Sequence, residues 1–224
     1  MALERRGPDS FNTFEVDKIN FCQARLTIVG DDNNGVQPCV KDGSVMVFNG
    51  EIYNYNELIN EFGFDSCCSD TDLLFALINR FDISSILPLI RGMFAIAYYD
   101  KGKLYLARDR FGQKPLYYQI ENDSLVFSSS LKDPNFNHLG LDDVSIDSFL
   151  RFGYVKSPNT IFKSIKKLSP NELLTFDGVN LESKSYSLRV SHSEKLIGSK
   201  TVSKADVDVG AFLSYGIDSG IVTT

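Results

Sequence analysis

The sequence of 224 residues lacks the features that mark several classes of protein. No apolar run approaches the roughly 18 residues of a membrane-spanning helix, because the most apolar stretch, residues 93–99, is short and follows Arg91. The first ten residues have no apolar core or small-residue cleavage site, so no signal peptide is predicted and we expect a cytoplasmic protein. The net charge of -6 provides no field for a polyanion, which argues against nucleic acid as a partner.

Residues that bind metals are also scarce. The sequence has two histidines and four cysteines, with no C-x-x-C spacing among Cys22, Cys39, Cys67 and Cys68. No metal site is predicted, and we expect free thiols that are buried or half-buried in a reducing compartment. What the chain does have is 43% hydrophobic and 23% charged residues, the balance of a compact globular protein.

The first half of the sequence predicts two strands and two helices. Residues 21–29 and 45–48 are short runs rich in β-branched and aromatic residues, which favour strands. Ser69, with Asp72 three residues later, indicates a helix N-terminus and places Asp70 in the first turn. The apolar residues at helical spacing are Tyr55, Leu58, Ile59 and Phe62 for one helix, and Leu74, Leu77, Ile78 and Phe81 for the other.

The second half predicts mainly strands. Residues 93–99 are apolar on both alternating faces, as in a strand covered on both sides. Strands at 104–107, 114–120 and 125–128 would continue an antiparallel meander. The predicted class is α+β, a sandwich of antiparallel sheets with helices outside. After Asp177 the chain is rich in serine and lysine, which is typical of a connector.

Several short strings, taken in order, identify a resemblance that no single string could carry. Together they resemble the glutaminase half of asparagine synthetase, a class II glutamine amidotransferase of the N-terminal-nucleophile hydrolase type. The resemblance implies an αββα sandwich that lacks its first strand. The strings are Arg6-Gly7-Pro8-Asp9, Arg25-Leu26-Thr27-Ile28-Val29, Asn49-Gly50-Glu51-Ile52-Tyr53-Asn54, Ser69-Asp70, Ala107-Arg108-Asp109-Arg110-Phe111-Gly112 and Lys114-Pro115-Leu116-Tyr117.

The resemblance implies a glutamine site. Arg25, in the string that continues through Leu26, Thr27, Ile28 and Val29, would hold the α-carboxylate of glutamine, for which a guanidinium offers two parallel hydrogen bonds. Glu51 and Asp70 would bind the α-ammonium, and Asn49 and Gly50 would form the oxyanion hole. Taken singly, the same residues have structural explanations: a strand-capping Arg, an Asn-Gly hairpin turn, a turn Glu and an Asp at a helix start.

The family's chemistry requires a cysteine as the first residue of the mature chain, because its thiolate attacks the amide and its free amine moves the proton. Here Met1 is followed by Ala2, and the four cysteines are internal. No residue of this chain is therefore predicted to be catalytic. Three smaller departures from the family's pattern are Arg5 in place of His, Gly30 in place of Asp and Ser130 in place of Glu.

The end of the sequence resembles the pyrophosphate-binding loop that opens the family's synthetase half. The ATP-binding residues implied are Leu213, Ser214, Gly216, Asp218 and Ser219, with Tyr215 in place of the loop's first glycine. The full-length family uses ATP with Mg2+, but none is expected to bind tightly here. The predicted organisation is a glutaminase domain over 1–180, a linker over 181–208 and a truncated start of an α/β ATP-pyrophosphatase domain over 209–224.

Three hypotheses follow. The first is the glutaminase portion of a glutamine-dependent asparagine synthetase, which transfers the amide of glutamine to aspartate with ATP, inactive as written for lack of the nucleophile. The second is a catalytically dead domain that binds glutamine or a partner, either a homologous subunit or a separate synthetase chain. The third is an unstable fragment, since the loss of an inner strand exposes sheet edges.

Overall fold

The computed structural model describes residues 7, 10–25, 35–64 and 66–186, apart from the side chain of Arg25. The chain divides into two compact units. The first consists of residues 1–26, 37–51 and 92–187, and the second of residues 27–36, 52–91 and 188–224. Each unit is described by itself below.

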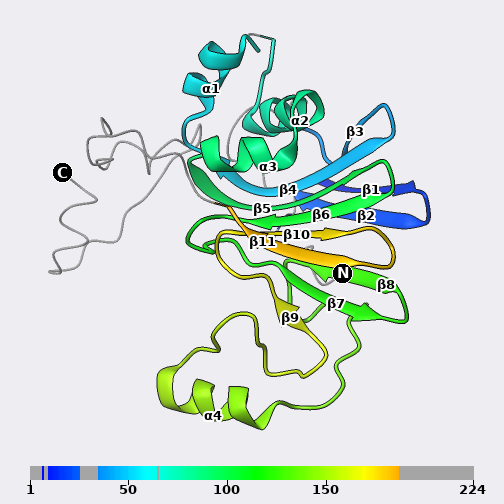
Figure 1. Cartoon of the computed structure of the whole chain (residues 1–224), viewed down its shortest axis with the longest axis vertical. Coiled ribbons are helices and arrows are strands. Elements are labelled where there is room, and N and C mark those ends of the chain that lie inside the picture. The colour runs from blue at the N-terminus through cyan, green and yellow to red at the C-terminus, as the bar shows by residue number, and fades with distance from the viewer. Residues whose placement is uncertain (1–6, 8–9, 26–34, 65, 187–224) are drawn as a thin grey trace, which may run out of the picture. The chain divides into compact units, whose positions relative to one another are not determined.

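A six-stranded sheet forms the centre of the first unit, and Figure 1 shows β4, β5 and β6 running side by side in it. Its order is β11-β10-β6-β5-β4-β3. The strands are β3 (Cys39–Lys41), β4 (Ser44–Ile52), β5 (Gly92–Asp100), β6 (Lys103–Arg108), β10 (Glu172–Phe176) and β11 (Leu181–Ser185). The turn between β5 and β6 places Lys101 and Gly102 at positive φ, which suits a tight hairpin.

Two smaller sheets belong to the same unit. One is the hairpin of β1 (Ser10–Val16) and β2 (Ile19–Arg25). The other has the order β8-β7-β9, with β7 (Tyr117–Glu121), β8 (Ser124–Ser128) and β9 (Lys166–Lys167). The predicted single meander is therefore wrong, because the chain leaves the large sheet after β6 and starts another sheet at β7. Helix α4 (Asp143–Phe152) lies away from these strands in Figure 1.

The hydrophobic core of the first unit lies between the large sheet and the two small ones. Strand periodicity directs Ala95, Ala97 and Tyr99 of β5 to this core, and the register pairs Ala97 with Leu106 of β6. Phe21 of β2 is fully buried in it. The alternate β5 residues Phe94, Ile96 and Tyr98 are also buried, which confirms the prediction of a strand covered on both faces.

The second unit is helical. It contains α1 (Tyr55–Phe62), α2 (Asp70–Arg80), α3 (Ile83–Ile86) and the 3-10 turn η2 (Leu87–Leu89). Ser69 caps α2 as predicted, since its side chain accepts a hydrogen bond from the Asp72 N–H at 3.1 Å. Leu74 and Leu77 are fully buried on the predicted apolar face, and α2 packs against α1 and α3.

The other predictions concern strand boundaries and the C-terminal part of the chain. Strand β1 was not predicted, and β7 begins at Tyr117 rather than at residue 114. Strand β11 pairs with β10, so the first five residues of the predicted linker, 181–185, form part of a sheet. The predicted second domain, 209–224, lies outside the described residues. Among the residues described, no helix is long and apolar enough to cross a membrane.

Candidate functional site

The Asn49-Gly50-Glu51 string lies inside strand β4. The hairpin turn that the Asn-Gly pair would otherwise suggest is therefore wrong, and so is a turn position for Glu51. Strand alternation places Asn49 on the same face as Val45 and Val47, which belong to the core between the sheets. Asn49 is thus a polar side chain at the end of a row of apolar ones on this face of β4.

Asn49 lines a cavity of about 640 Å³ within the first unit. The large sheet contributes Val47, Ala95 and Ala97 to this cavity, and β2 and β8 contribute its sides. The volume is within the range of about 300–1,000 Å³ that is usual for small-molecule sites. Asn20, Gln23 and Asn135 line the same cavity, so amide residues lie beside apolar ones and can orient a small polar ligand.

Two glutamine side chains hold the residue before Asn49. The Phe48 N–H donates to Gln37 Oε1 at 2.6 Å, and Gln23 Nε2 donates to the Phe48 carbonyl at 3.3 Å. Gln37 is 6% exposed, and its backbone carbonyl accepts a hydrogen bond from Asn12 Nδ2 at 3.0 Å. These positioning residues were missed by sequence reasoning, because nothing in their local pattern indicates a partner in β4.

Gly50 is required by its neighbour in the sheet. A Cβ at this position would lie 2.1 Å from the Met93 carbonyl oxygen and 2.7 Å from Phe94 Cα. No side chain fits there without a shift of β5 backbone. The glycine that the resemblance assigns to the oxyanion hole is thus needed for the close approach of β5.

Asp70 lies in the second unit as the first residue of α2. Its carboxylate accepts the Ile52 N–H at 3.0 Å and the Thr71 hydroxyl at 3.4 Å. The side chain is 8% exposed, and this burial raises the pKa of Asp70 despite the two hydrogen bonds, which lower it. Asp70 therefore fixes the residue that directly follows Glu51, in addition to any role with a ligand.

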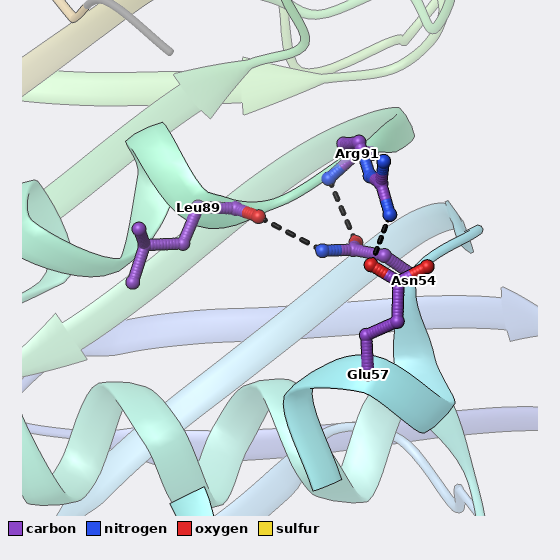
Figure 2. Close-up of polar contacts among 4 residues, drawn as sticks. All are labelled: Asn54, Glu57, Leu89 and Arg91. Atoms are coloured by element: carbon purple, nitrogen blue, oxygen red, sulfur yellow. Dashed lines mark hydrogen bonds and ion pairs between the residues drawn. The ribbon is translucent and has the colours of Figure 1, made fainter. Parts of the chain in front are cut away.

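The last residue of the same string, Asn54, has a structural role that Figure 2 shows. Its side chain donates to the Leu89 carbonyl at 2.9 Å and accepts the Arg91 N–H at 2.8 Å. The Arg91 guanidinium forms an ion pair with Glu57 of α1. Asn54 thus joins the start of α1 to the segment that leads into β5.

In the Arg108–Lys114 loop, the charged side chains of Arg108 and Asp109 form hydrogen bonds with backbone groups. Arg108 donates to the carbonyls of Gly112, Lys114 at 2.7 Å and Leu168 at 2.6 Å. Asp109 is 0% exposed. Its carboxylate accepts four backbone N–H groups, those of Phe94, Phe111, Gln113 and Lys114. This string of the resemblance builds the fold and presents no polar side chain of this pair to a ligand.

The other predicted site residues are only partly described. Arg25 ends β2, but its side chain lies outside the described residues, as do Leu26, Thr27, Ile28 and Val29. The ATP-binding residues Leu213, Ser214, Gly216, Asp218 and Ser219 also lie outside them, so their fit to ATP with Mg2+ is untested. Asn49, Gly50 and Glu51 lie in the first unit and Asp70 in the second, and their assembly into one pocket stays a prediction.

The cysteines are free, but not all of them are buried or half-buried as expected. Cys39 is buried and Cys67 intermediate, whereas Cys22 and Cys68 are exposed. Cys39 is the first residue of β3. No group of three or more His, Cys, Asp or Glu side chains suited to a metal ion occurs in the part of the chain that the structure describes.

Comparison with known proteins adds the family. The profile of the family described as "Glutamine amidotransferase domain" matches residues 1–187. Glutamine-hydrolysing asparagine synthetase 1 of Bacillus subtilis is 33% identical over 99% of this chain and 39% of its own length. The amidase chyE of Penicillium rubens is 30% identical over 97% of this chain and 36% of its own length. The chain therefore spans about two fifths of the length of these relatives.

One solved structure, titled as the allosteric regulatory enzyme of purine biosynthesis, superposes with a TM-score of 0.51 and 18% identity. The match covers 75% of this chain and 35% of the other. At this identity the likeness concerns the fold alone. Together with the antiparallel sheets described above, it confirms the predicted α+β class.

Proposed function

Because the chain belongs to the glutamine amidotransferase domain family and is homologous to the glutaminase part of asparagine synthetases, we propose that it recognises free glutamine through the β4 end. One observation carries the proposal. Asn49 lines a cavity of about 640 Å³ while the Phe48 backbone is held by Gln23 and Gln37. An amide side chain at the wall of a cavity, next to a held backbone, suits a preorganised oxyanion site.

The proposed roles follow the chemistry of the ligand. Arg25 pairs with the α-carboxylate, since a guanidinium binds a carboxylate with two parallel hydrogen bonds. Glu51 and Asp70 bind the α-ammonium, and the Asn49 amide with the Gly50 N–H faces the amide oxygen. Asp70 already accepts the Ile52 N–H, so its carboxylate is oriented before the ligand arrives. Leu26, Thr27, Ile28 and Val29 are proposed as further glutamine-binding residues.

All four cysteines are internal, and none of them is proposed as the nucleophile. Cys22, which lines the same cavity as Asn49, is a poor substitute, because partial burial and the charge of Asp133 raise the pKa of its thiol. A module that binds glutamine without cleaving it is the second form of the same proposal.

The activity of a whole asparagine synthetase belongs to a longer protein. There, ammonia from glutamine would be transferred to aspartate with ATP and Mg2+, in the cytoplasm. The predicted division at 180 and 208, and the start of an ATP-pyrophosphatase domain at 209, belong to this proposal. A homologous subunit or a separate synthetase chain is the proposed protein partner.

Calorimetric titration of the chain with glutamine tests the proposal. We expect saturable binding that Arg25→Ala weakens at least about 30-fold, as for the loss of a charge-assisted hydrogen-bond pair. The matched control is Arg110→Ala, an exposed arginine stacked on Phe111, which should bind glutamine like the wild type. Binding that survives Arg25→Ala, or no heat of binding by a chain with a folded circular dichroism spectrum, would contradict the proposed site.

A glutamate-release assay tests whether an internal thiol cleaves the bound glutamine. The chain should release no glutamate above the rate of a buffer blank, and Cys22→Ser should change nothing. Release that disappears in Cys22→Ser would show that an internal thiol acts as nucleophile, against our expectation.

A further inference from the structure

Two cysteines are direct neighbours in the segment that connects α1 to α2 in the second unit (Figure 1). Cys67 is half-buried and Cys68 is exposed, and both are free thiols. Neither residue belongs to a helix or a strand, so no regular ladder of backbone hydrogen bonds holds this part of the chain. The proposed glutamine contacts include neither thiol.

The contacts of this pair are made within the connecting segment and with α1. The Cys67 N–H donates to the Phe64 carbonyl at 3.0 Å, and the Cys67 carbonyl accepts the Tyr55 hydroxyl at 2.7 Å. The Cys68 thiol donates to the Ser66 carbonyl at 3.6 Å. The Tyr55 hydroxyl therefore orients the peptide unit that joins the two cysteines.

The two thiols differ in how readily they meet a reagent in solution. Burial raises the pKa of the Cys67 thiol, and the charges of Asp72 and Cys68 raise it further. The thiolate is the form that attacks a disulfide, so a smaller share of Cys67 is reactive at neutral pH than of an ordinary free cysteine. Cys68 is exposed and is reached first. The expected order of reaction is thus Cys68 and then Cys67.

A disulfide between direct neighbours is strained. The peptide bond between Cys67 and Cys68 is trans, and Cα atoms joined by a trans peptide are about 3.8 Å apart. Disulfides usually join Cα atoms that are about 4.4–6.8 Å apart, and departures from this geometry make the bond easier to reduce. Strained and exposed disulfides are the labile ones. A disulfide at this place would therefore form and break with the redox conditions.

We propose that Cys67 and Cys68 are a reversible modification site for small-molecule disulfides such as oxidised glutathione. The Cys68 thiolate attacks the reagent, forms a mixed disulfide and releases one reduced thiol, which takes up the proton of Cys68. The Cys67 thiolate then attacks Cys68 Sγ and displaces the second reduced thiol, which takes up the proton of Cys67. Two protein thiols are oxidised to one disulfide, and one reagent disulfide is reduced to two thiols.

The new bond changes the start of α2. It strains the peptide unit that the Tyr55 hydroxyl holds, so this hydrogen bond is weakened. Ser69 follows directly and caps α2, since its side chain accepts the Asp72 N–H at 3.1 Å. Oxidation should therefore weaken the cap, and reduction should restore it.

This site is independent of the proposed function, because its product is a bond between two residues that are not proposed glutamine contacts. Glutamine binding can fail in a chain whose cysteines still form the disulfide. The disulfide can equally fail to form in a chain that binds glutamine, so the two failures are distinguishable.

Mass spectrometry of the full chain after treatment with oxidised glutathione tests the proposal. The remaining free thiols are alkylated before digestion with trypsin. This protease places the cysteines in separate peptides, with the pair in 42–80, Cys22 in 19–25 and Cys39 in 26–41. We expect peptide 42–80 to be lighter by two hydrogen atoms and to carry no glutathione. The exposed Cys22, which has no cysteine beside it in the sequence, should carry glutathione instead.

Two single variants separate the two steps. Cys67→Ser should stop at the mixed disulfide, so that peptide 42–80 keeps one glutathione. Cys68→Ser should react at least about tenfold more slowly, because the remaining thiol is half-buried. The matched control Cys22→Ser removes an exposed thiol elsewhere and should leave the oxidation of peptide 42–80 unchanged.

Three results of the mass measurement would overturn the proposal. The first is a stable glutathione adduct on peptide 42–80 of the wild type. The second is an unmodified peptide 42–80 in a chain whose Cys22 is modified. The third is a disulfide that joins this peptide to Cys22, to Cys39 or to a second copy of the chain.

NMR of the intact chain measures the effect on α2. The amides of Cys68 and Asp72 should shift on oxidation, and dithiothreitol should return them to their original positions. An Asp72 amide that stays unchanged in the oxidised chain would overturn the link to the helix cap. Shifts that dithiothreitol does not reverse would overturn the reversibility.

Discussion

The Arg108–Lys114 loop and the end of β4 approach the same residues of β5, but their polar groups meet different surroundings. Asp109 accepts the Phe94 N–H at 3.2 Å, together with three further N–H groups, and is completely buried. Gly50 lies against the backbone of Met93 and Phe94, and its neighbour Asn49 faces a cavity. Both regions carry strings of the family resemblance.

The difference separates motif residues that form the fold from those available to a ligand. Arg108 and Asp109 use their charged side chains on the chain's own carbonyl and N–H groups, so a ligand would have to compete with the fold for them. At the β4 end, Gln23, Gln37 and Asp70 hold the backbone on either side of the string. The loop should therefore respond to mutation in stability, and the β4 end in binding.

The largest expected effect is that of Asp109→Ala. It leaves four backbone N–H groups without their acceptor, and we expect a loss of at least about 3 kcal/mol in the free energy of unfolding. Urea unfolding followed by circular dichroism measures it. Asp147→Ala, which breaks an exposed pair with Arg151 on α4, should cost no more than about 0.5 kcal/mol. Equal losses of unfolding free energy in the two variants would contradict a special role of Asp109 in stability.

The next effect is that of Gly50→Ala. The added Cβ would meet the Met93 carbonyl oxygen at 2.1 Å, so β5 must shift, at a cost of about 1–3 kcal/mol. Gly43→Ala is the control, because its φ is +85° but nothing lies within 4 Å of the added Cβ. Gly43→Ala should be destabilised by only about 1 kcal/mol, the cost of a left-handed backbone conformation for a residue with a Cβ. A smaller loss for Gly50→Ala than for Gly43→Ala would show that the contact with β5 relaxes easily.

Gln37→Ala should have a moderate effect on stability and a visible one on the site. The Phe48 N–H loses its buried acceptor, which costs about 1–2 kcal/mol. NMR shifts of the Phe48 and Asn49 amides should change, and glutamine affinity should fall with them. The exposed Gln113→Ala is the control and should stay within about 0.5 kcal/mol of the wild type. Intact glutamine binding in Gln37→Ala would show that Phe48 needs no such support.

Asp70→Asn should change stability least, by about 1 kcal/mol or less. Burial raises the pKa of Asp70 in the folded chain above its usual 3.8, so its favourable contribution is complete below that value. The contribution is lost as pH rises through the folded pKa. The variant keeps an acceptor for the Ile52 N–H, and it should be slightly more stable than the wild type at pH 7, with a flatter profile above pH 3.8.

Glutamine titration of the same variant gives the second half of this prediction. If Asp70 binds the α-ammonium, the neutral side chain should weaken affinity at least about tenfold while thermal stability is kept or raised. Lower stability with unchanged affinity would assign Asp70 to the fold alone.

Local patterns in the sequence were sufficient for much of the fold. The helix at 55–62, the Ser69 cap and the doubly buried strand at 93–99 were predicted because each depends on neighbours within a few residues. Strand β1 was missed, and β7 was assigned to the wrong sheet. Both errors concern strand pairing, which joins residues far apart in the chain and leaves little local signal.

The sequence by itself determined the family, since motif order survives without coordinates, and it predicted the residue types of a glutamine site. Only the tertiary structure decided that Asn49 is a strand residue facing a cavity, that Gly50 makes room for β5, and that Gln37 holds Phe48. It also turned the Arg108–Asp109 string from a candidate motif into a structural one. The physical reason is common to all four: hydrogen bonding and packing depend on which distant segments meet, and composition does not contain that.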